Sequence, residues 1–179
     1  DAPYLDNTAE ITLNPIDEDV PDASNTGTQI SAMLANTGLN DPITDEDADA
    51  KEGIAVISVL NTGGIWQYDA DRNGIFKDFP EDIAENKAVL LNDRAILRFL
   101  PDFNFNGDSR LAFRAWDQTA GVNGDTRSDT TRNGGTTAFS TDIHEAEITV
   151  RSVNDMPLFQ DTDIPDAVED ADYSYTIKT

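Results

Sequence analysis

The sequence predicts an all-β protein: a Greek-key sandwich of antiparallel strands with long loops and at most one short helix. Two observations lead to this prediction. Short segments rich in β-branched and aromatic residues recur along the chain, and most of them alternate with a period of two, as half-buried strands do. Gly, Asn, Asp and Pro residues separate these segments, which is typical of the turns in a sandwich.

Seven segments are expected to form strands. In chain order they are residues 9–13, 53–60, 64–69, 88–91, 95–100, 109–117 and 146–153. In the sixth segment, Leu111, Phe113 and Ala115 share one face, while Arg114 and Trp116 share the other. This alternation predicts that the two faces of that strand have different surroundings.

Two further segments lack the strand pattern. Residues 29–38 form the candidate helix, which we expect to end at Gly38. Residues 119–142 are rich in Gly and Thr and have no apolar period, so we expect a long loop. Loops of this length in a compact domain are usually functional or mark the place of an insertion.

A weak internal repeat predicts the domain organisation. Residues 1–4 resemble residues 155–158, and the acidic pair Glu18-Asp19 resembles Glu169-Asp170. The two matches occur in the same order and at nearly the same spacing. We therefore expect one module over residues 1–153, with residues 154–179 forming a linker and the start of a next module. In the alternative, residues 154–179 complete a single module that is split by an inserted domain, either in the long loop or near Pro157.

The composition indicates bound cations. The chain of 179 residues has no cysteine, and its 35 acidic against 12 basic residues give a net charge of −23. A small secreted domain without disulfides needs another source of stability, and metal ions are the usual one. Carboxylates at this density also repel one another unless cations neutralise them. Hard oxygen ligands suit Ca²⁺. A solubilising or salt-adapted surface is the alternative explanation.

The same features disfavour several partners. So acidic a surface repels nucleic acid and anionic membranes. No apolar run approaches the roughly 20 residues of a membrane span, and no charged-then-apolar leader is present, so we expect no membrane insertion.

Acidic residues at two places are candidate calcium ligands. Asp45, Asp47 and Asp49 stand at every second position, so their carboxylates converge on one side of an extended or looping backbone, and a divalent cation removes their repulsion. An exposed acidic turn is the alternative. Asp117 ends a strand, where loops gather. Asp102 is a weaker candidate, because loop geometry alone explains much of the Asn- and Asp-rich turn that contains it.

The segment "DADRNG" begins a calcium-loop pattern with Asp69, Asp71 and Asn73. Pro80 stands where the EF-hand version needs Glu, and aromatic strands flank the segment in place of helices. Asn-Gly is also a strong β-hairpin signal. We therefore favour a hairpin turn here, with a calcium ion as the secondary interpretation.

Catalysis is not expected. The chain has no cysteine and a single histidine, His144, which stands beside Glu145 at the entrance to the last strand. A carboxylate pair of the glycosidase type stays open, but carboxylates are so abundant that finding two proves nothing. Trp66, Tyr68 and Phe79 could form a sugar-stacking platform, although aromatic residues at strand positions more often belong to the core.

Six segments in order resemble the cadherin-like repeats of giant bacterial surface proteins, which include the RTX adhesins. The segments are "GIAVISV", "GIWQYD", "ILRFLPDFNFNG", "LAFRAWDQTAG", "NGGTTAFSTD" and "ITVRSVNDMP". The resemblance is dense over residues 53–157 and loose before them. It implies a cadherin- or immunoglobulin-like sandwich that is rigidified by Ca²⁺, with the ions bound mainly at the junctions between modules.

The resemblance also implies a set of calcium ligands: Glu18, Asp45, Asp47, Asp117, Asn154 and Asp155. Asp19, which follows Glu18, is a further candidate ligand. Glu18 resembles the acidic ligand early in the first strand, the residues 45–47 resemble the D-x-D pair, and the residues 154–155 resemble the linker motif. Ser152, Met156 and the residues after Asp117 depart from the family pattern, which implies fewer ions per junction than the three of the vertebrate proteins.

The function that this resemblance implies is a non-catalytic extender or scaffold module of a large bacterial surface adhesin. Calcium at the module junctions would stiffen it, and it would support a ligand-binding domain. Its expected partners are neighbouring modules of the same polypeptide and an inserted ligand-binding domain, and we expect a monomer that is extracellular, on the cell surface or secreted. The alternative function is an adhesin module that contacts carbohydrate or a protein partner directly through the long Gly/Thr loop.

Overall fold

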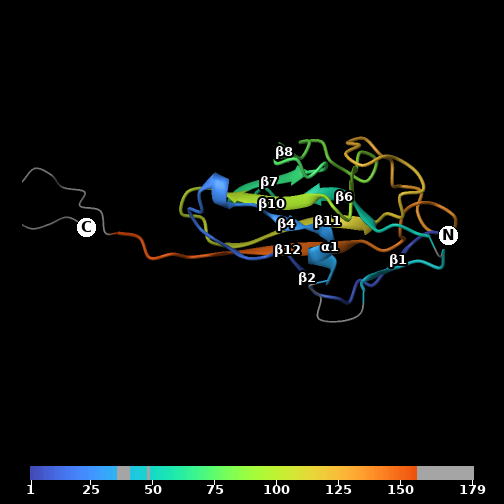
Figure 1. Cartoon of the computed structure of the whole chain (residues 1–179), viewed down its shortest axis with the longest axis horizontal. Helices are drawn as coiled ribbons and strands as arrows, with labels where there is room; N and C mark the ends of the chain where they lie inside the picture. Colours follow the sequence, from blue (N-terminus) through green and yellow to red (C-terminus); the bar gives the residue numbers. More distant parts are fainter. Residues whose placement is uncertain (36–40, 48, 157–179) are drawn as a thin grey trace, which may run out of the picture.

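The computed structural model describes residues 1–35, 41–47 and 49–156, which form two facing β-sheets and a separate two-stranded sheet of residues 4–5 and 43–44 (Figure 1). All seven expected strands are present: β2 (Ile11–Thr12), β6 (Gly53–Val59), β7 (Gly64–Asp69), β9 (Val89–Asn92), β10 (Ile96–Pro101), β11 (Gly107–Ala115) and β12 (His144–Arg151). The prediction of an all-β sandwich is therefore confirmed.

Several short elements were not expected. Besides β2, five further strands have two residues each: β1 (Tyr4–Leu5), β3 (Ile16–Asp17), β4 (Thr28–Gln29), β5 (Ile43–Thr44) and β8 (Lys77–Asp78). The expected helix forms as α1 (Ile30–Ala35), and a 3₁₀ turn, η1 (Asp22–Ser24), precedes it. Gly38, which we expected to end the helix, and the segment after Met156 lie outside the described residues.

The two main sheets have an immunoglobulin-like strand arrangement. One sheet has the order β4-β10-β7-β8, and the other has the order β2-β12-β11-β6-β9, with β3 also paired to β12. The connections β6–β7, β8–β9, β9–β10 and β10–β11 cross between the sheets, as in Greek-key sandwiches, whereas β7–β8 and β11–β12 join neighbours in one sheet. The first strands β2 and β3 run parallel to the last strand β12, whereas the other pairs in these sheets are antiparallel.

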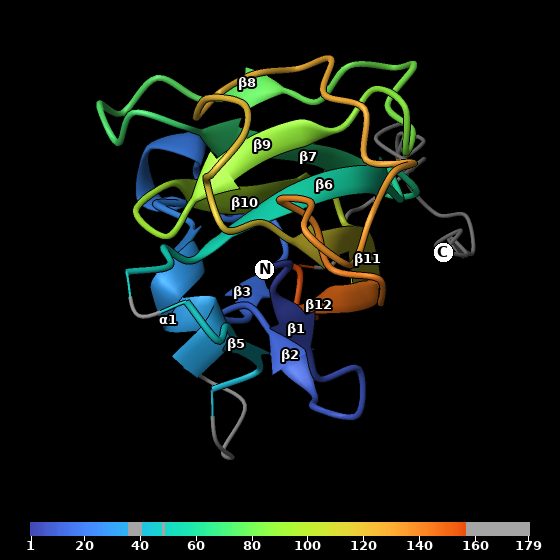
Figure 2. The ribbon, with the colours of Figure 1, turned by 90° about the vertical axis from the view of Figure 1, so that its right-hand side faces the viewer.

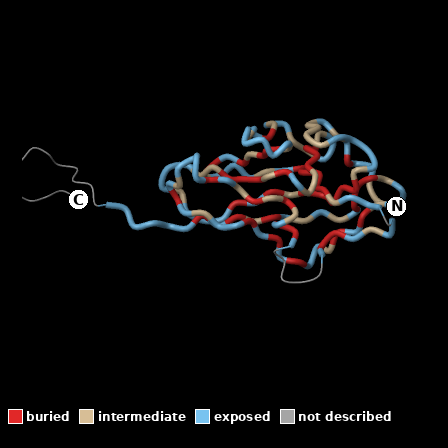
Figure 3. Tube along the Cα trace, viewed as in Figure 1, coloured by how far each residue is buried: buried red, intermediate tan, exposed pale blue. Residues whose placement is uncertain are grey.

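The core lies between the sheets because each strand turns its apolar face inward (Figure 3). Trp66 and Phe99 pack against each other across the four-stranded sheet, with ring centroids 5.5 Å apart. The indole N–H of Trp66 donates a hydrogen bond to Ser109 Oγ at 2.9 Å, which satisfies the one polar atom of the side chain. Trp66, Tyr68 and Phe79 are all buried, as expected for core residues.

A second, smaller core covers the outer face of the other sheet. It consists of Ala55, Ile57, Ala88, Leu90, Trp116, Ala138 and Phe139. The last two residues belong to the long loop 119–142, which therefore folds back over β6, β9 and β11. This packing explains why Trp116 is buried although it faces away from the main core.

The two ends of the described chain lie at opposite ends of the sandwich (Figure 1). Figure 2 looks along the sandwich from the end that carries the N-terminus, with the edges of both sheets visible. In the part of the chain that the structure describes, no helix is long and apolar enough to cross a membrane.

Candidate functional site

Four of the predicted calcium ligands gather at the N-terminal end of the sandwich. A cavity of about 320 Å³ is lined by Asp47, Asp49 and Asp117, and an adjoining cavity of about 110 Å³ is lined by Asp45 and Asp47. Asp117 follows β11, whereas the other three residues follow β5. The fold thus brings together residues that lie about seventy positions apart in the sequence. We call these four residues the acidic corner.

Within the acidic corner, Asp45 has an unsatisfied carboxylate oxygen. Its Oδ1 accepts a hydrogen bond from the backbone N–H of Asp47 at 2.8 Å, which closes a tight turn. Its Oδ2 is enclosed by protein atoms and has no hydrogen-bond donor among the described residues. A buried anionic oxygen without a partner is costly, and a bound cation would remove that cost.

Asp117 is also held in a fixed position. It is buried, and its Oδ1 accepts hydrogen bonds from the backbone N–H of Thr119 at 2.8 Å and from Thr119 Oγ1 at 2.7 Å. Gln118, between them, has a positive φ of 64°. The turn after β11 therefore uses only one oxygen of the Asp117 carboxylate, and no donor to Oδ2 is found among the described residues.

Positive charges already lie at the acidic corner. The α-ammonium group of Asp1 contacts the Asp47 carboxylate, and this hydrogen bond is the main cause of the raised pKa of that amino group. Lys51 lines both cavities. Among residues 1–35, 41–47 and 49–156, no group of three or more histidine, aspartate or glutamate side chains is arranged to hold a metal ion. The acidic corner therefore has candidate ligands but not a finished coordination shell.

Glu18 lies at the other end of the sandwich, where β12 ends. It is buried, and its two carboxylate oxygens accept hydrogen bonds from the Val153 N–H at 2.7 Å and from Asn106 Nδ2 at 3.0 Å. The Glu18 N–H also donates to the carbonyl oxygen of Arg151 at 2.8 Å. Glu18 therefore joins the start of the chain to the residues that lead out of the sandwich.

Asp19 and the linker residues complete this end. Asp19 Oδ1 accepts a hydrogen bond from the Asn104 N–H at 3.0 Å, and both residues have a positive φ, 57° and 58°. Asn154 and Asp155 are exposed and lie just beyond β12. Two residues of the Asn-rich turn, Asn104 and Asn106, are thus the partners of Asp19 and Glu18, which the local sequence pattern does not indicate.

The remaining candidates are explained by turns. Asp69 is buried, and its carboxylate accepts backbone N–H bonds from Asn73 at 3.2 Å and Gly74 at 2.7 Å. Asp71 and Asn73 are exposed in the loop that joins the antiparallel strands β7 and β8, so the hairpin interpretation is confirmed. Asp102 is exposed in the turn before β11, where its carbonyl oxygen accepts the Phe105 N–H at 3.0 Å.

Sequence reasoning missed a pair of carboxyl groups near the acidic corner. Glu52 is half-buried and shares a hydrogen bond with Asp41. Burial, followed by this hydrogen bond and by the charges of Asp41 and Asp93, raises the pKa of Glu52 to about 7. Glu52 also lines the smaller cavity of the acidic corner. The sequence contains no periodic signal for this pair, because only the fold brings the two side chains together.

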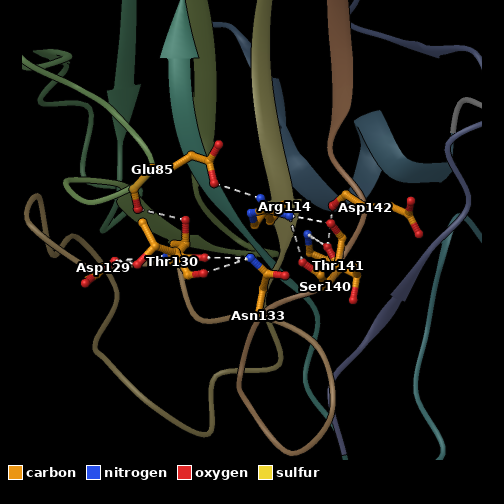
Figure 4. Close-up of polar contacts among 10 residues, drawn as sticks. Glu85, Arg114, Asp129, Thr130, Asn133, Ser140, Thr141 and Asp142 are labelled. Atoms are coloured by element: carbon orange, nitrogen blue, oxygen red, sulfur yellow. Dashed lines mark hydrogen bonds and ion pairs between the residues drawn. The ribbon is translucent and has the colours of Figure 1, made fainter.

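The long loop is fastened to the sheet by a buried arginine. Arg114, on β11, donates from Nη1 to the carbonyl oxygens of Ser140 and Thr141, and its Nη2 pairs with Glu85 Oε2 at 2.8 Å (Figure 4). Thr130 Oγ1 donates to the carbonyl oxygen of Glu85 at 2.8 Å. These bonds fix both halves of the loop to the same place on the sheet.

His144, the single histidine, is part of the fold. Its two ring nitrogens each lie 2.6 Å from a carbonyl oxygen, those of Ala9 and Glu145. The ring therefore connects the segment before β2 with the start of β12.

Searches of protein-family models, of curated proteins and of solved structures each find no match to this chain.

Proposed function

We propose that this chain is a non-catalytic, calcium-stabilised extender or scaffold module of a large bacterial surface adhesin. The observation that carries this proposal is the acidic corner with the unsatisfied Asp45 Oδ2. Asp45, Asp47 and Asp117 supply oxygen ligands only, which suits Ca²⁺. The resemblance to the cadherin-like repeats of RTX adhesins supports the same proposal.

The positions of the acidic residues at the two ends of the sandwich support a role in a chain of tandem modules. The acidic corner lies beside Asp1, where the chain enters the sandwich, whereas Glu18 binds Val153, where the chain leaves it, and Asp19 follows Glu18. In a string of such modules, the residues around Glu18 and the linker residues 154–155 would face the acidic corner of the next module. A calcium ion shared across that junction would hold neighbouring modules in line, in the extracellular fluid where Ca²⁺ is millimolar.

The packing of the long loop favours this structural role over direct ligand binding through the loop. Ala138 and Phe139 are buried in the second core, and Thr130 and Ser140 are fully enclosed. These residues serve the fold and are not free to contact a carbohydrate or a protein partner.

Thermal unfolding in CaCl₂, in MgCl₂ and in EDTA tests the proposal. A ligand at about 100 times its Kd stabilises a protein by about 2.7 kcal/mol, which corresponds to roughly 5–10 °C for a domain of this size. We expect a rise of that order with Ca²⁺ and a much smaller one with Mg²⁺. The double variant Asp45→Asn/Asp117→Asn should lose the calcium response.

The matched control is Asp71→Asn, which removes one carboxylate from the exposed hairpin and should keep the full calcium response. Equal melting temperatures in CaCl₂ and EDTA would sink the proposal. Loss of the response in Asp71→Asn, with the double variant unaffected, would move the ion to the hairpin and would overturn the assignment to the acidic corner.

A further inference from the structure

A pocket of about 460 Å³ lies on the outer face of the four-stranded sheet, between η1 and the β7–β8 hairpin. Its lining includes Asp22, Asn25, Asp69, Phe76, Ile96 and Arg98. Leu97 and Phe99 of β10 point into the core, so the alternate residues Ile96 and Arg98 point outward and form the floor. No part of the proposed calcium function uses this pocket.

Arg98 is the central group of the pocket. Only 8% of this residue is exposed, and its guanidinium carbon lies 3.8 Å from the centroid of the Phe76 ring. Its Nε donates to Gln67 Oε1 at 2.8 Å, and its Nη1 contacts Asp22 Oδ1 at 2.6 Å and the Asn25 carbonyl oxygen at 3.1 Å. Its Nη2 has no acceptor among the described residues.

A second unpaired group lies beside Arg98. Asn25 is buried, and its Nδ2 donates to the Phe99 carbonyl oxygen at 2.7 Å, which fixes the orientation of the amide. Its Oδ1 has no hydrogen-bond donor among the described residues. Asn25 Oδ1 is enclosed by protein atoms, so Arg98 Nη2 is the unpaired polar atom that a ligand in the pocket can reach. A hydroxyl group can accept a hydrogen bond from Nη2 and donate one to the exposed Asp22 carboxylate, since it is both donor and acceptor.

The charges and apolar groups of the pocket select the ligand class. The charged groups of the pocket are already partnered: Arg98 pairs with Asp22 at 2.6 Å, and the Asp69 carboxylate accepts the backbone N–H groups of Asn73 and Gly74. The pocket therefore offers no free charge to an ionic ligand, and the net charge of −23 disfavours an anion further. Phe76 and Ile96 offer apolar surface beside the polar groups. A neutral ligand with several hydroxyl groups and an apolar face fits this combination. We propose that the pocket binds a saccharide.

This site would give the module a ligand of its own, whether or not calcium is bound at the acidic corner. It differs from the long loop in place and in mechanism, because it lies on the opposite sheet. Its affinity is expected to be modest, in the range of a Kd of about 1 mM, since the pocket is open and its ligand makes few hydrogen bonds.

Saturation-transfer NMR on the whole chain tests the proposal. The probes are the methyl glycosides of glucose, galactose, mannose, N-acetylglucosamine and fucose, each at about 10 mM, or roughly ten times the expected Kd. We expect at least one of them to receive saturation from the protein, in CaCl₂ and in EDTA alike. Sodium acetate serves as the anionic probe, and a glycoside should not be displaced by it.

Three variants assign the signal to the pocket. Phe76→Ala removes the partly exposed ring, and Arg98→Lys removes the planar group with its unpaired donor. Both should weaken glycoside binding at least tenfold. Ile75→Ala is the matched control, because Ile75 is 63% exposed and does not line the pocket. No saturation of any glycoside, unchanged binding in Phe76→Ala, or displacement by acetate would each overturn the proposal.

Discussion

At the scale of single residues, Glu52 couples the stability of the fold to pH. Its pKa is about 7 in the folded protein against an ordinary value of 4.5, because burial and the neighbouring Asp41 disfavour its charge. Between these two values the folded state binds more protons than the unfolded state. Stability is therefore expected to fall as the pH rises from about 4.5 to about 7.

The variant Glu52→Gln removes this titration while keeping a partner for Asp41. We expect it to be more stable than the parent at pH 8 by about 1 kcal/mol, a value reduced for solvent screening at a half-buried site, and to show no gain below pH 5. Urea unfolding in EDTA at several pH values measures this difference. Glu46→Gln, at an exposed position of the same segment, is the control. Parallel pH profiles for the parent and Glu52→Gln would contradict the prediction.

At the scale of elements, the loop 119–142 behaves as a third layer of the sandwich. Its backbone pairs with β9, where Leu90 N–H donates to the Asp125 carbonyl oxygen at 2.8 Å and Gly124 N–H donates to the Leu90 carbonyl oxygen at 2.7 Å. This pairing covers the edge of the sheet, which would otherwise be open to another strand. Phe139 then seals the outer face over Trp116.

Phe139→Ala tests this description of the loop. Removing a buried phenylalanine ring should lower the free energy of unfolding by about 3 kcal/mol, because the loss of buried apolar surface leaves a cavity. Val122→Ala changes the same loop at a residue that is 68% exposed and should have an effect below about 0.5 kcal/mol. Urea unfolding followed by tryptophan fluorescence measures the stability of both variants. Equal stabilities of the two variants would mean that the loop is not part of the core.

How well the sequence predicts an element depends on the length of that element. The seven expected strands were predictable, because each lies in a segment of four or more residues that is rich in β-branched or aromatic side chains or alternates, and that turn residues bound. The strands β1, β3, β4, β5 and β8 were not, because a two-residue pairing leaves no period to detect. The covering role of the loop was missed because only two of its residues, Ala138 and Phe139, are apolar and buried.

In the candidate site, too, the sequence indicates the local features but not the tertiary contacts. The turn from Asp45 to Asp47 and the position of Asp117 at a strand end are local features, and the sequence indicates both. That these residues share one corner depends on how β5 and β11 end at the same side of the sandwich. The pairing of Glu52 with Asp41, and the pocket around Arg98, also arise only from tertiary contacts.

At the scale of the whole molecule, the net charge of −23 opposes the compact state. In EDTA we expect NaCl to raise the melting temperature by a few degrees between about 20 mM and 500 mM, because salt screens the repulsion between exposed carboxylates. CaCl₂ at the same ionic strength should raise it further, since a specific site adds to the screening. Identical melting temperatures in NaCl and CaCl₂ at matched ionic strength would mean that calcium acts as a general counter-ion only.

The parallel pairing of β2 and β3 with β12 has a mechanical consequence. The first strands and the last strand lie side by side, and the chain enters at one end and leaves at the other (Figure 1). A pulling force on the two ends would act along these strands in opposite directions. It would load all the hydrogen bonds between these strands at the same time, in shear, and would not break them one after another. A fold with this geometry resists extension.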